Sequence, residues 1–541
     1  MKTLKFLTLI IYCFTLQSFA TNEDEINEEL RRLIERAAVI GKPIVIGDEA
    51  VISRHVLPRF YEQRNFEMAW RKKKDVDELL EAISNAHLEG LRAEDYHLEM
   101  IKHYRAMKNR SAFERAEYDI LLSDAFLIYG SHLLSGKVNP ETLNAEWKAD
   151  RREADMAAVL ENTLKERSVS QSLEDLKPKY KAYERLKRSL VMYRDIEKSG
   201  GWQLIPAGET LKPGMEDERI LPLRKRLSST GDLPIYKVQN ELLFDEKLEE
   251  AVKKFQRRHG LTADGAIGPN TLSILNTSVY DRIEKLIVNL ERCRWLPQDL
   301  GEHYILTNIA NFELELVRKN EIELEMDVIV GKEFRKTPVF SSRMTYLVLN
   351  PTWTIPPTIL ANDVLPAIKK DISYLSKNRM KIISGSGSRE VEVDPSTIDW
   401  LTITAKNFPY MIRQEPGTHN ALGAVKFMFP NTYNVYLHDT NRKDLFDKTD
   451  RALSSGCIRV SKPIDLTTHL LKDDPKWDRK KIEAAIASGK TQTIMLPQPV
   501  NVHLLYWTAY MDENELINFR KDIYERDQNL LRALRESHQP L

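Results

Sequence analysis

Cysteine is scarce in this chain, with 3 among 541 residues. Cys13 lies close to the N-terminus, so Cys293 and Cys457 are the two that remain if a leader is removed. A secreted domain held together by disulfides carries many more cysteines than this. The sequence therefore excludes a disulfide scaffold, and leaves a single bridge between Cys293 and Cys457 as an alternative to two free thiols.

The chain also lacks an excess of either charge. Lys+Arg and Asp+Glu both number 80, so composition gives no reason to expect a nucleic acid or an anionic membrane as partner. The 12 histidines are scattered, and no Cys/His cluster has the spacing of a metal site. We expect no nucleic-acid partner, no metal and no cofactor.

Long apolar runs are missing as well. Residues 6–14 form a short apolar core after two lysines, and Ser18-Phe19-Ala20 is a small-x-small cleavage site. A membrane-spanning helix needs about 20 apolar residues, which this core does not supply. We interpret residues 1–20 as a cleaved secretory signal, with an uncleaved anchor as the alternative, and expect no stable membrane span after cleavage.

The length predicts two to four domains. Apolar residues at helical spacing predict a helical scaffold domain over 21–205, with helices at 75–87, 112–134 and 173–197. Glycines and prolines then indicate a linker. A compact three-helix unit is expected over 206–278, and a second large domain over 279–541.

The large C-terminal domain has the pattern of strands. Alternating or β-branched runs predict a mainly β, sandwich- or barrel-like domain with strands at 303–310, 313–318, 321–330, 346–349, 433–437, 493–496 and 502–510. Residues 353–413 interrupt them as a partly helical insert, which is a candidate lid or a surface insertion without function. Residues 493–541 supply the last strands and a helix. The fold class is therefore multidomain α+β.

Candidate chemistry lies between residues 433 and 465. His438 follows an apolar run, so a strand can aim its ring, and Cys457 lies in a Ser-Ser-Gly-Cys turn. A thiol attacks as its thiolate, which a neighbouring imidazole can generate. Gly456 permits a sharp turn, so the N–H of Cys457 can face a developing oxyanion. The alternative is a buried core thiol and a surface histidine.

Three neighbours are further candidates. Tyr436 precedes His438 by two residues, on the same strand face, and is a candidate second oxyanion donor. Arg459 is always charged, and either holds a substrate carboxylate or fixes the turn through carbonyls. His419, in the Pro416–Gly423 loop, is a rival base.

Two sets of motifs resemble known families. His438-Asp439-Thr440 and Ser454-Ser455-Gly456-Cys457-Ile458-Arg459 resemble the active-site signature of L,D-transpeptidases with a YkuD-type catalytic domain. Ser455 replaces the more common His and Arg459 the more common Asn, as in large Gram-negative periplasmic members. Residues 255–260 and 264–271 resemble the type-1 peptidoglycan-binding module. The order of parts is similar over nearly the whole mature chain.

The resemblance implies a periplasmic acyltransferase. It assigns Cys457 as nucleophile, and His438 as a base oriented by the backbone carbonyl of Asp439. It also implies that the substrate lies against Arg459, Ser455, Trp353 and Asn420. Tetrapeptide stems of peptidoglycan would lose D-alanine and form 3→3 cross-links, and carbapenems would acylate the same thiol. The implied partners are peptidoglycan stem peptides, its glycan and other cell-wall synthesis enzymes.

Several alternatives remain open from sequence. Water as acceptor gives an L,D-carboxypeptidase, a lipoprotein lysine gives protein anchoring, and a free D-amino acid gives exchange. A cross-link hydrolase is a fourth alternative. Outside this class, the chain could be a non-catalytic wall-binding protein. A general cysteine protease is disfavoured by the β-rich surroundings of Cys457.

Overall fold

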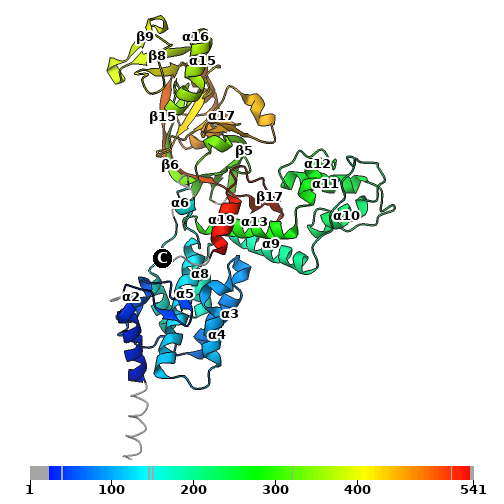
Figure 1. Ribbon diagram of the computed structural model, residues 1–541. Coiled ribbons are helices and arrows are strands. Elements are labelled where there is room, and N and C mark those ends of the chain that lie inside the picture. Colours follow the sequence, from blue (N-terminus) through cyan, green and yellow to red (C-terminus); the bar gives the residue numbers. More distant parts are fainter. Residues whose placement is uncertain are drawn as a thin grey trace, which may run out of the picture.

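The computed structural model describes residues 23–37, 41–143, 147–148, 151–319, 321–512 and 515–536. The predicted signal segment 1–20 lies outside the described residues. Figure 1 shows a helical scaffold at one end, a β domain beyond it with its insert at the far end, and a small helical module projecting sideways. None of the helices in the described ranges is both long and apolar enough to cross a membrane.

The scaffold packs its helices around one long buried helix, α5. Its N-terminal helix (23–37) and a two-stranded hairpin lie against this bundle. Ser111 caps α5 in a capping box with Glu114, which fixes where the helix begins. The elements are β1 (Val45–Ile46), β2 (Glu49–Ala50), α2 (Val56–Gln63), α3 (Lys73–Ser84), α4 (Leu98–Ala106), α5 (Ala112–Ser135), α6 (Pro140–Leu143), α7 (Met156–Glu166), α8 (Val169–Leu176) and α9 (Lys181–Lys198).

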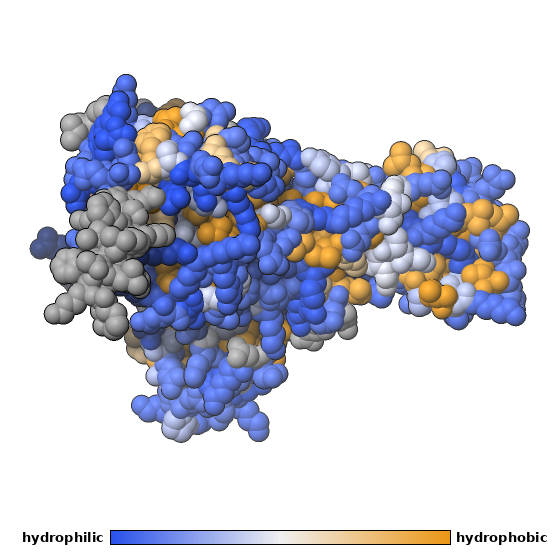
Figure 2. Space-filling model, turned by 90° about the horizontal axis from the view of Figure 1, so that it is seen from below, coloured by the Kyte–Doolittle hydropathy of each residue, from blue (hydrophilic) through white to orange (hydrophobic). Residues whose placement is uncertain are grey.

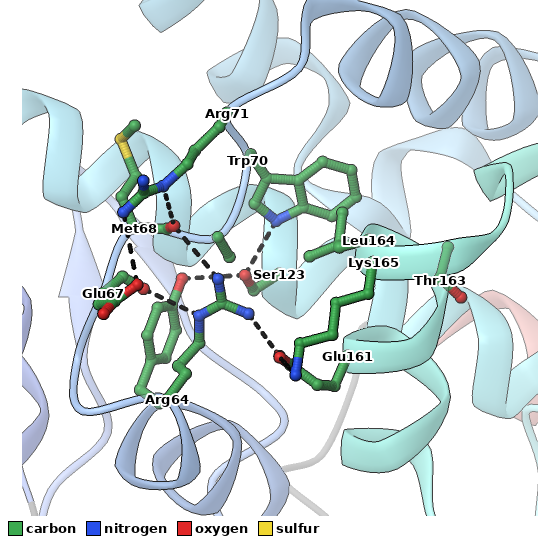
Figure 3. Close-up of polar contacts among 12 residues, drawn as sticks. Arg64, Glu67, Met68, Trp70, Arg71, Ser123, Glu161, Thr163, Leu164 and Lys165 are labelled. Carbon is green, nitrogen blue, oxygen red and sulfur yellow. Dashed lines mark hydrogen bonds and ion pairs between the residues drawn. The ribbon is translucent and has the colours of Figure 1, made fainter.

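Polar contacts tie the scaffold helices together. Figure 3 shows Arg64, at the end of α2, reaching Glu161 on α7 and the carbonyl of Met68. In the same view the Trp70 indole donates to the Ser123 hydroxyl on α5, at 3.0 Å. Buried polar groups are costly without partners, so the Trp70 indole allows α5 to carry the Ser123 hydroxyl inside the bundle.

His97 of this bundle has a carboxylate at each of its two ring nitrogens. Its Nε2 lies 2.8 Å from a carboxylate oxygen of Asp124 on α5, and its Nδ1 contacts Glu49 on β2. Burial alone would lower the pKa of His97, but the hydrogen bonds to Asp124 and Glu49 outweigh it and raise the pKa to about 9. The charged imidazole therefore fastens the hairpin to α5.

His97→Asn is expected to lower the free energy of unfolding of the scaffold by about 3 kcal/mol below pH 6.5. The folded pKa lies above the ordinary value of 6.5, so the stabilisation is complete below that pH and is lost as pH rises through about 9. Asn tolerates the positive φ of 56° at this position. Urea unfolding followed by circular dichroism at pH 6 and pH 10 measures the difference.

The exposed His87→Asn is the matched control, and we expect it to change stability by less than about 0.5 kcal/mol at either pH. An equal loss for His97→Asn at pH 6 and pH 10 would contradict the ion-pair explanation.

The projecting module has three helices, α10 (Ile220–Ser229), α11 (Glu246–Arg258) and α12 (Pro269–Leu275). Leu248, Val252 and Phe255 of α11 are buried in its core, as their spacing predicts. Gln256 holds the Asp264–Thr271 loop by donating to the carboxylate of Asp264 at 2.7 Å. Figure 2, seen from the scaffold end, shows the module extending to one side with separate apolar residues among polar ones.

A small core joins all three parts. Helix α13 (Val279–Arg294) packs between α9 and a hairpin of β16 (Ala509–Met511) and β17 (Ile517–Phe519). The module is fastened to that hairpin, because Arg258 of α11 donates to the carbonyl of Ile517 at 2.8 Å. The parts are therefore connected by side-chain contacts as well as by the chain.

The β domain is a closed barrel. The order is β13-β5-β14-β12-β11-β6-β15-β3-β4, and β4 also pairs with β5, which closes eight of the described strands into a ring. Helices α17 (Pro463–Leu470), α18 (Arg479–Ala487) and α19 (Asp527–Arg535) accompany it. The strands are β3 (His303–Asn308), β4 (Glu313–Arg318), β5 (Glu321–Gly331), β6 (Phe340–Leu349), β11 (Val425–Met428), β12 (Leu437–His438), β13 (Ala452–Ser454), β14 (Ile458–Val460) and β15 (Gln492–Leu505). The sequence prediction of a barrel-like domain in a multidomain α+β protein is confirmed.

The insert forms a separate small sheet with its own apolar core, above the barrel in Figure 1. Its strand order is β7-β10-β8-β9. The elements are β7 (Trp353–Thr354), α14 (Pro357–Ile359), α15 (Leu365–Lys370), α16 (Ser373–Lys377), β8 (Met380–Ser384), β9 (Val391–Val393) and β10 (Met411–Gln414), with a π-turn at Leu360–Val364.

Two described residues of the scaffold, Val138 and Trp147, belong to the barrel core. Trp147 pairs with Val339 in a parallel bridge, and its ring lies 4.9 Å from that of Trp295. It is buried with the strands of the β domain, not with the helical bundle.

Three sequence predictions of elements were wrong. Residues 173–197 form two helices, because Pro178 offers no N–H and ends the first at Leu176. The strand predicted at 433–437 shortens to Leu437–His438, since Asn434 has a positive φ of 55°. The strands at 493–496 and 502–510 are one strand, β15, which ends at Leu505 and whose register shifts between Met495 and Val500.

Candidate active site

The candidate nucleophile and base lie on neighbouring parallel strands. Strand β12 pairs with β14 so that Leu437 faces Ile458 and His438 faces Arg459. Leu437 and Ile458 point into the barrel core, so the residues beside them point outward. Tyr436, His438, Cys457 and Arg459 therefore gather on one outer face of the barrel.

The ring of His438 is held in one tautomer. It is buried, and its Nδ1–H donates to the carbonyl of Asp439, which leaves Nε2 as an acceptor. The Asp439 carboxylate accepts from the N–H groups of Ala424 at 2.8 Å and Thr440 at 2.7 Å, which fixes that carbonyl in place. Burial, together with the nearby charge of Arg459, lowers the pKa of His438 to about 3. The imidazole is neutral and able to accept a proton.

The turn before Cys457 is built by short hydrogen bonds. Gly456 has a φ of +115°, which residues with a side chain rarely adopt. The Ser454 hydroxyl donates to the carbonyl of Cys457 at 2.5 Å, and the Thr337 hydroxyl to that of Gly456 at 2.9 Å. Among the described residues, nothing accepts from the N–H of Cys457. The turn thus presents a free amide beside the thiol, as an oxyanion site requires.

Cys457 is half-buried and lies against Tyr436. The thiol lies 3.8 Å from the carbonyl oxygen of Asn434. Burial raises the pKa of Tyr436 far above the usual range, and the nearby Cys457 raises it further. The Tyr436 and His438 rings are 5.6 Å apart. Burial raises the pKa of Cys457, while contacts with Tyr436 and the charges of Lys426 and Arg459 oppose this.

Ser455 connects the turn to the insert. Its hydroxyl accepts from Arg335 at 2.8 Å, and the same guanidinium nitrogen bonds Asp363 of the insert at 2.8 Å. Ser455 is exposed, so a substrate can reach it.

Two other predicted residues lie in less accessible places. Asn420 is fully buried, and its amide donates to the carbonyls of Pro351 and Glu415, so its side chain shapes a turn and has no surface for a substrate. His419 neighbours it, and its carbonyl accepts from Asn441 at 3.0 Å. The remaining thiol, Cys293, is buried and free, and burial raises its pKa to about 12.

Sequence reasoning missed Thr337, Arg335 and Lys426. Thr337 lies within a Lys-Thr-Pro run and Arg335 directly precedes it, and neither position indicates contact with a turn 119 or 120 residues away. Lys426 lies opposite His438 across β11 and β12, a register that only the fold reveals. No cluster of three or more His, Cys, Asp or Glu residues that could hold a metal occurs in the described ranges.

Comparison with known families divides the chain into three. Residues 55–190 match a scaffold domain, residues 216–275 a "Putative peptidoglycan binding domain", and residues 302–478 an L,D-transpeptidase catalytic domain. These matches confirm the resemblance that the motifs predict.

A curated relative from Haemophilus influenzae, named "Putative L,D-transpeptidase", is 37% identical over 247 residues, which cover 46% of this chain and 49% of the relative. The match thus spans about half the length of that protein. The L,D-transpeptidase (Yku) structure from Stackebrandtia nassauensis is 13% identical, with a TM-score of 0.22, covering 55% of this chain and 94% of that one. An L,D-transpeptidase from Mycobacterium smegmatis is 11% identical, with a TM-score of 0.18, covering 37% and 58%.

Proposed function

We propose that this protein forms 3→3 cross-links between peptidoglycan stems in the periplasm. The premise is that residues 302–478 match an L,D-transpeptidase catalytic domain, in a chain that also matches a peptidoglycan-binding and a scaffold domain. The observation that carries the proposal is the pairing of β12 with β14. It brings a neutral His438 and the Cys457 turn onto one face of the barrel.

The reaction is an acyl transfer in two steps. His438 Nε2 takes the proton of the Cys457 thiol, and the sulfur attacks the carbonyl that precedes the terminal D-alanine of a tetrapeptide stem. The C–N bond breaks, D-alanine leaves with the proton from His438, and a thioester remains. The side-chain amine of a second stem then attacks the thioester, its proton passes to His438, and the thiol is released.

The surrounding groups suit the charges of this reaction. The free N–H of Cys457 and the hydroxyl of Tyr436 are placed to donate to the oxyanion, and such donors contribute about 100- to 1000-fold in rate. The unpaired Nε of Arg459 supports the role of binding a stem carboxylate over that of fixing the turn.

Mass spectrometry of muropeptides incubated with the protein tests the proposal. We expect a dimer with the mass of two tetrapeptide stems less one D-alanine, with the new bond between two diaminopimelate residues. Tripeptide product alone would instead identify water as the acceptor and an L,D-carboxypeptidase. Adding a lipoprotein peptide or a free D-amino acid distinguishes anchoring and exchange in the same assay.

The peptidoglycan-binding domain is proposed to hold wall polymer near the site. Thr262 in its loop contacts Thr449 at 3.2 Å, in the segment between His438 and Cys457. A cleft of about 970 Å³ lies at this junction, lined by residues of α12, α13 and residues 446–451. Export to the periplasm, supported by residues 1–20, is tested by cell fractionation.

The insert is proposed to act as a lid over the thiol. Arg335→Met removes the contacts with both Asp363 and Ser455, and is expected to lower kcat/KM by about fivefold, since a partly exposed ion pair is worth about 1 kcal/mol. Muropeptide kinetics measure this change. Asp363→Asn should give a similar loss, and adding it to Arg335→Met should cause little more.

Lys377→Met is the control for the lid. It removes an ion pair with Asp371 that lies wholly inside the insert, so kcat/KM should stay unchanged. Unchanged kinetics in Arg335→Met would contradict the proposed contact between the lid and the turn.

A further inference from the structure

Three residues lie side by side across the outer face of the barrel. Lys426 on β11 is the register partner of His438 on β12, and His438 is the partner of Arg459 on β14. Side chains of directly paired residues point to the same face and lie close together. The candidate base is therefore flanked by a cation on each side.

Lys426 has no anionic partner. Its ammonium lies 3.9 Å from the centre of the Tyr436 ring, and it forms no ion pair with any carboxylate of the described residues. The buried Lys137, by contrast, lies 2.8 Å from Asp95. A half-buried ammonium loses hydration, and the face of a tyrosine ring replaces only part of it. No carboxylate of the described residues balances this charge, which interacts electrostatically with Cys457.

The charged groups around Cys457 come from several elements. The cations are Lys426 from β11, Arg459 from β14, and Arg442 and Lys443 from the segment after β12. The titratable groups beside them are Tyr436, just before β12, and His438 in β12. Arg442 is paired with Asp444, and Lys443 with Asp439, so Lys426 and Arg459 are the cations left unpaired among these. Both oppose the rise in the pKa of Cys457 that burial causes, and both lower the pKa of His438.

This arrangement differs from a simple thiolate–imidazolium pair. A protonated His438 would lie between two cations, so the imidazolium is disfavoured at rest. A negative charge on Cys457 would instead find the unpaired ammonium of Lys426 beside it. The negative charge that Cys457 needs for attack is thus stabilised by Lys426 on β11, while His438 accepts the proton.

We propose that Lys426 is a positioning residue for the nucleophile: its ammonium, held against the Tyr436 ring, stabilises the negative charge that Cys457 acquires when its proton passes to His438. The inference rests on the proposed function only in taking Cys457 as the nucleophile.

The rate of alkylation of Cys457 by iodoacetamide, a neutral reagent, tests this at each pH without any substrate. Mass spectrometry of the Cys457 peptide reports the site, and Cys457→Ala confirms that peptide's assignment. We expect Lys426→Met to move the alkylation midpoint up by about one pH unit, which is about tenfold slower labelling at neutral pH. Lys426→Arg keeps the charge and should retain the wild-type profile. Thermal melting of both variants reports that they are folded.

Lys381→Met is the control for overall charge. Lys381 is a partly exposed lysine of the insert, paired with Glu392 and Glu415, so its loss should leave the profile unchanged. A Lys426→Met profile that superimposes on the wild type overturns the inference. So does a variant whose profile is unchanged but whose KM for muropeptide rises, because that assigns Lys426 to substrate binding. Wild-type protein that forms no cross-links would contradict the proposed function. The alkylation result could still be interpreted, because that assay uses no substrate.

Discussion

Cys457→Ala is expected to lower the rate of cross-link formation by at least about 10⁴-fold, because the acyl group then has no nucleophile to accept it. The substitution removes one sulfur from a half-buried position and leaves the Gly456 turn intact. Muropeptide mass spectrometry measures the rate, and intact-protein mass spectrometry shows whether the stem adduct still forms. Cys457→Ser keeps the size of the side chain, and should also be nearly inactive because a serine hydroxyl ionises far less readily.

Cys293→Ala provides the matched control, since it removes the other free thiol of the described chain. Cys293 is buried among α9, α13 and the β16–β17 hairpin, so its loss should cost about 1 kcal/mol of stability and leave the rate unchanged. If Cys457→Ala formed cross-links at the wild-type rate, the assignment of Cys457 as the nucleophile would be wrong.

His438→Gln is expected to slow the reaction by about 10²- to 10⁴-fold, the usual contribution of a general acid–base residue. Glutamine keeps a polar side chain but cannot hold the transferred proton. In the wild type, the low pKa of His438 keeps the imidazole neutral down to acidic pH. The acid limb of kcat/KM should therefore lie well below pH 6.5, the ordinary value for histidine.

His419→Gln separates the two candidate bases. His419 lies in the turn that Asn420 shapes, and its substitution should change the rate by less than about threefold. A larger loss for His419→Gln than for His438→Gln would reverse the assignment.

The sequence predicted the parts of the site that are close together in the chain. The glycine at position 456 indicates the turn by its residue type. The apolar run before His438 indicates the strand on which that histidine lies. The motif resemblance also implied the carbonyl of Asp439, which the structure places on His438 Nδ1.

Contacts between distant residues could not be predicted in this way. A lysine in a strand usually points to water, and only the register of β11 with β12 shows that Lys426 lies beside His438. Asn420 shows the opposite case, because its amide satisfies backbone carbonyls inside a turn. The local sequence pattern indicates which residue types are available for a site. Which of them lie next to one another in space depends on the pairing of strands that are tens of residues apart.

Trp147 extends the catalytic unit far beyond the residues that its family match covers. It adds an edge to the barrel at Val339 and packs its ring against Trp295 and Tyr506, although it lies about 150 residues before the first strand of the match. A growing chain must keep this tryptophan available until the barrel has been synthesised. A catalytic domain cut out at the boundary of its family match would lose this bridge and these ring contacts, so its core would be incomplete without a segment of the scaffold.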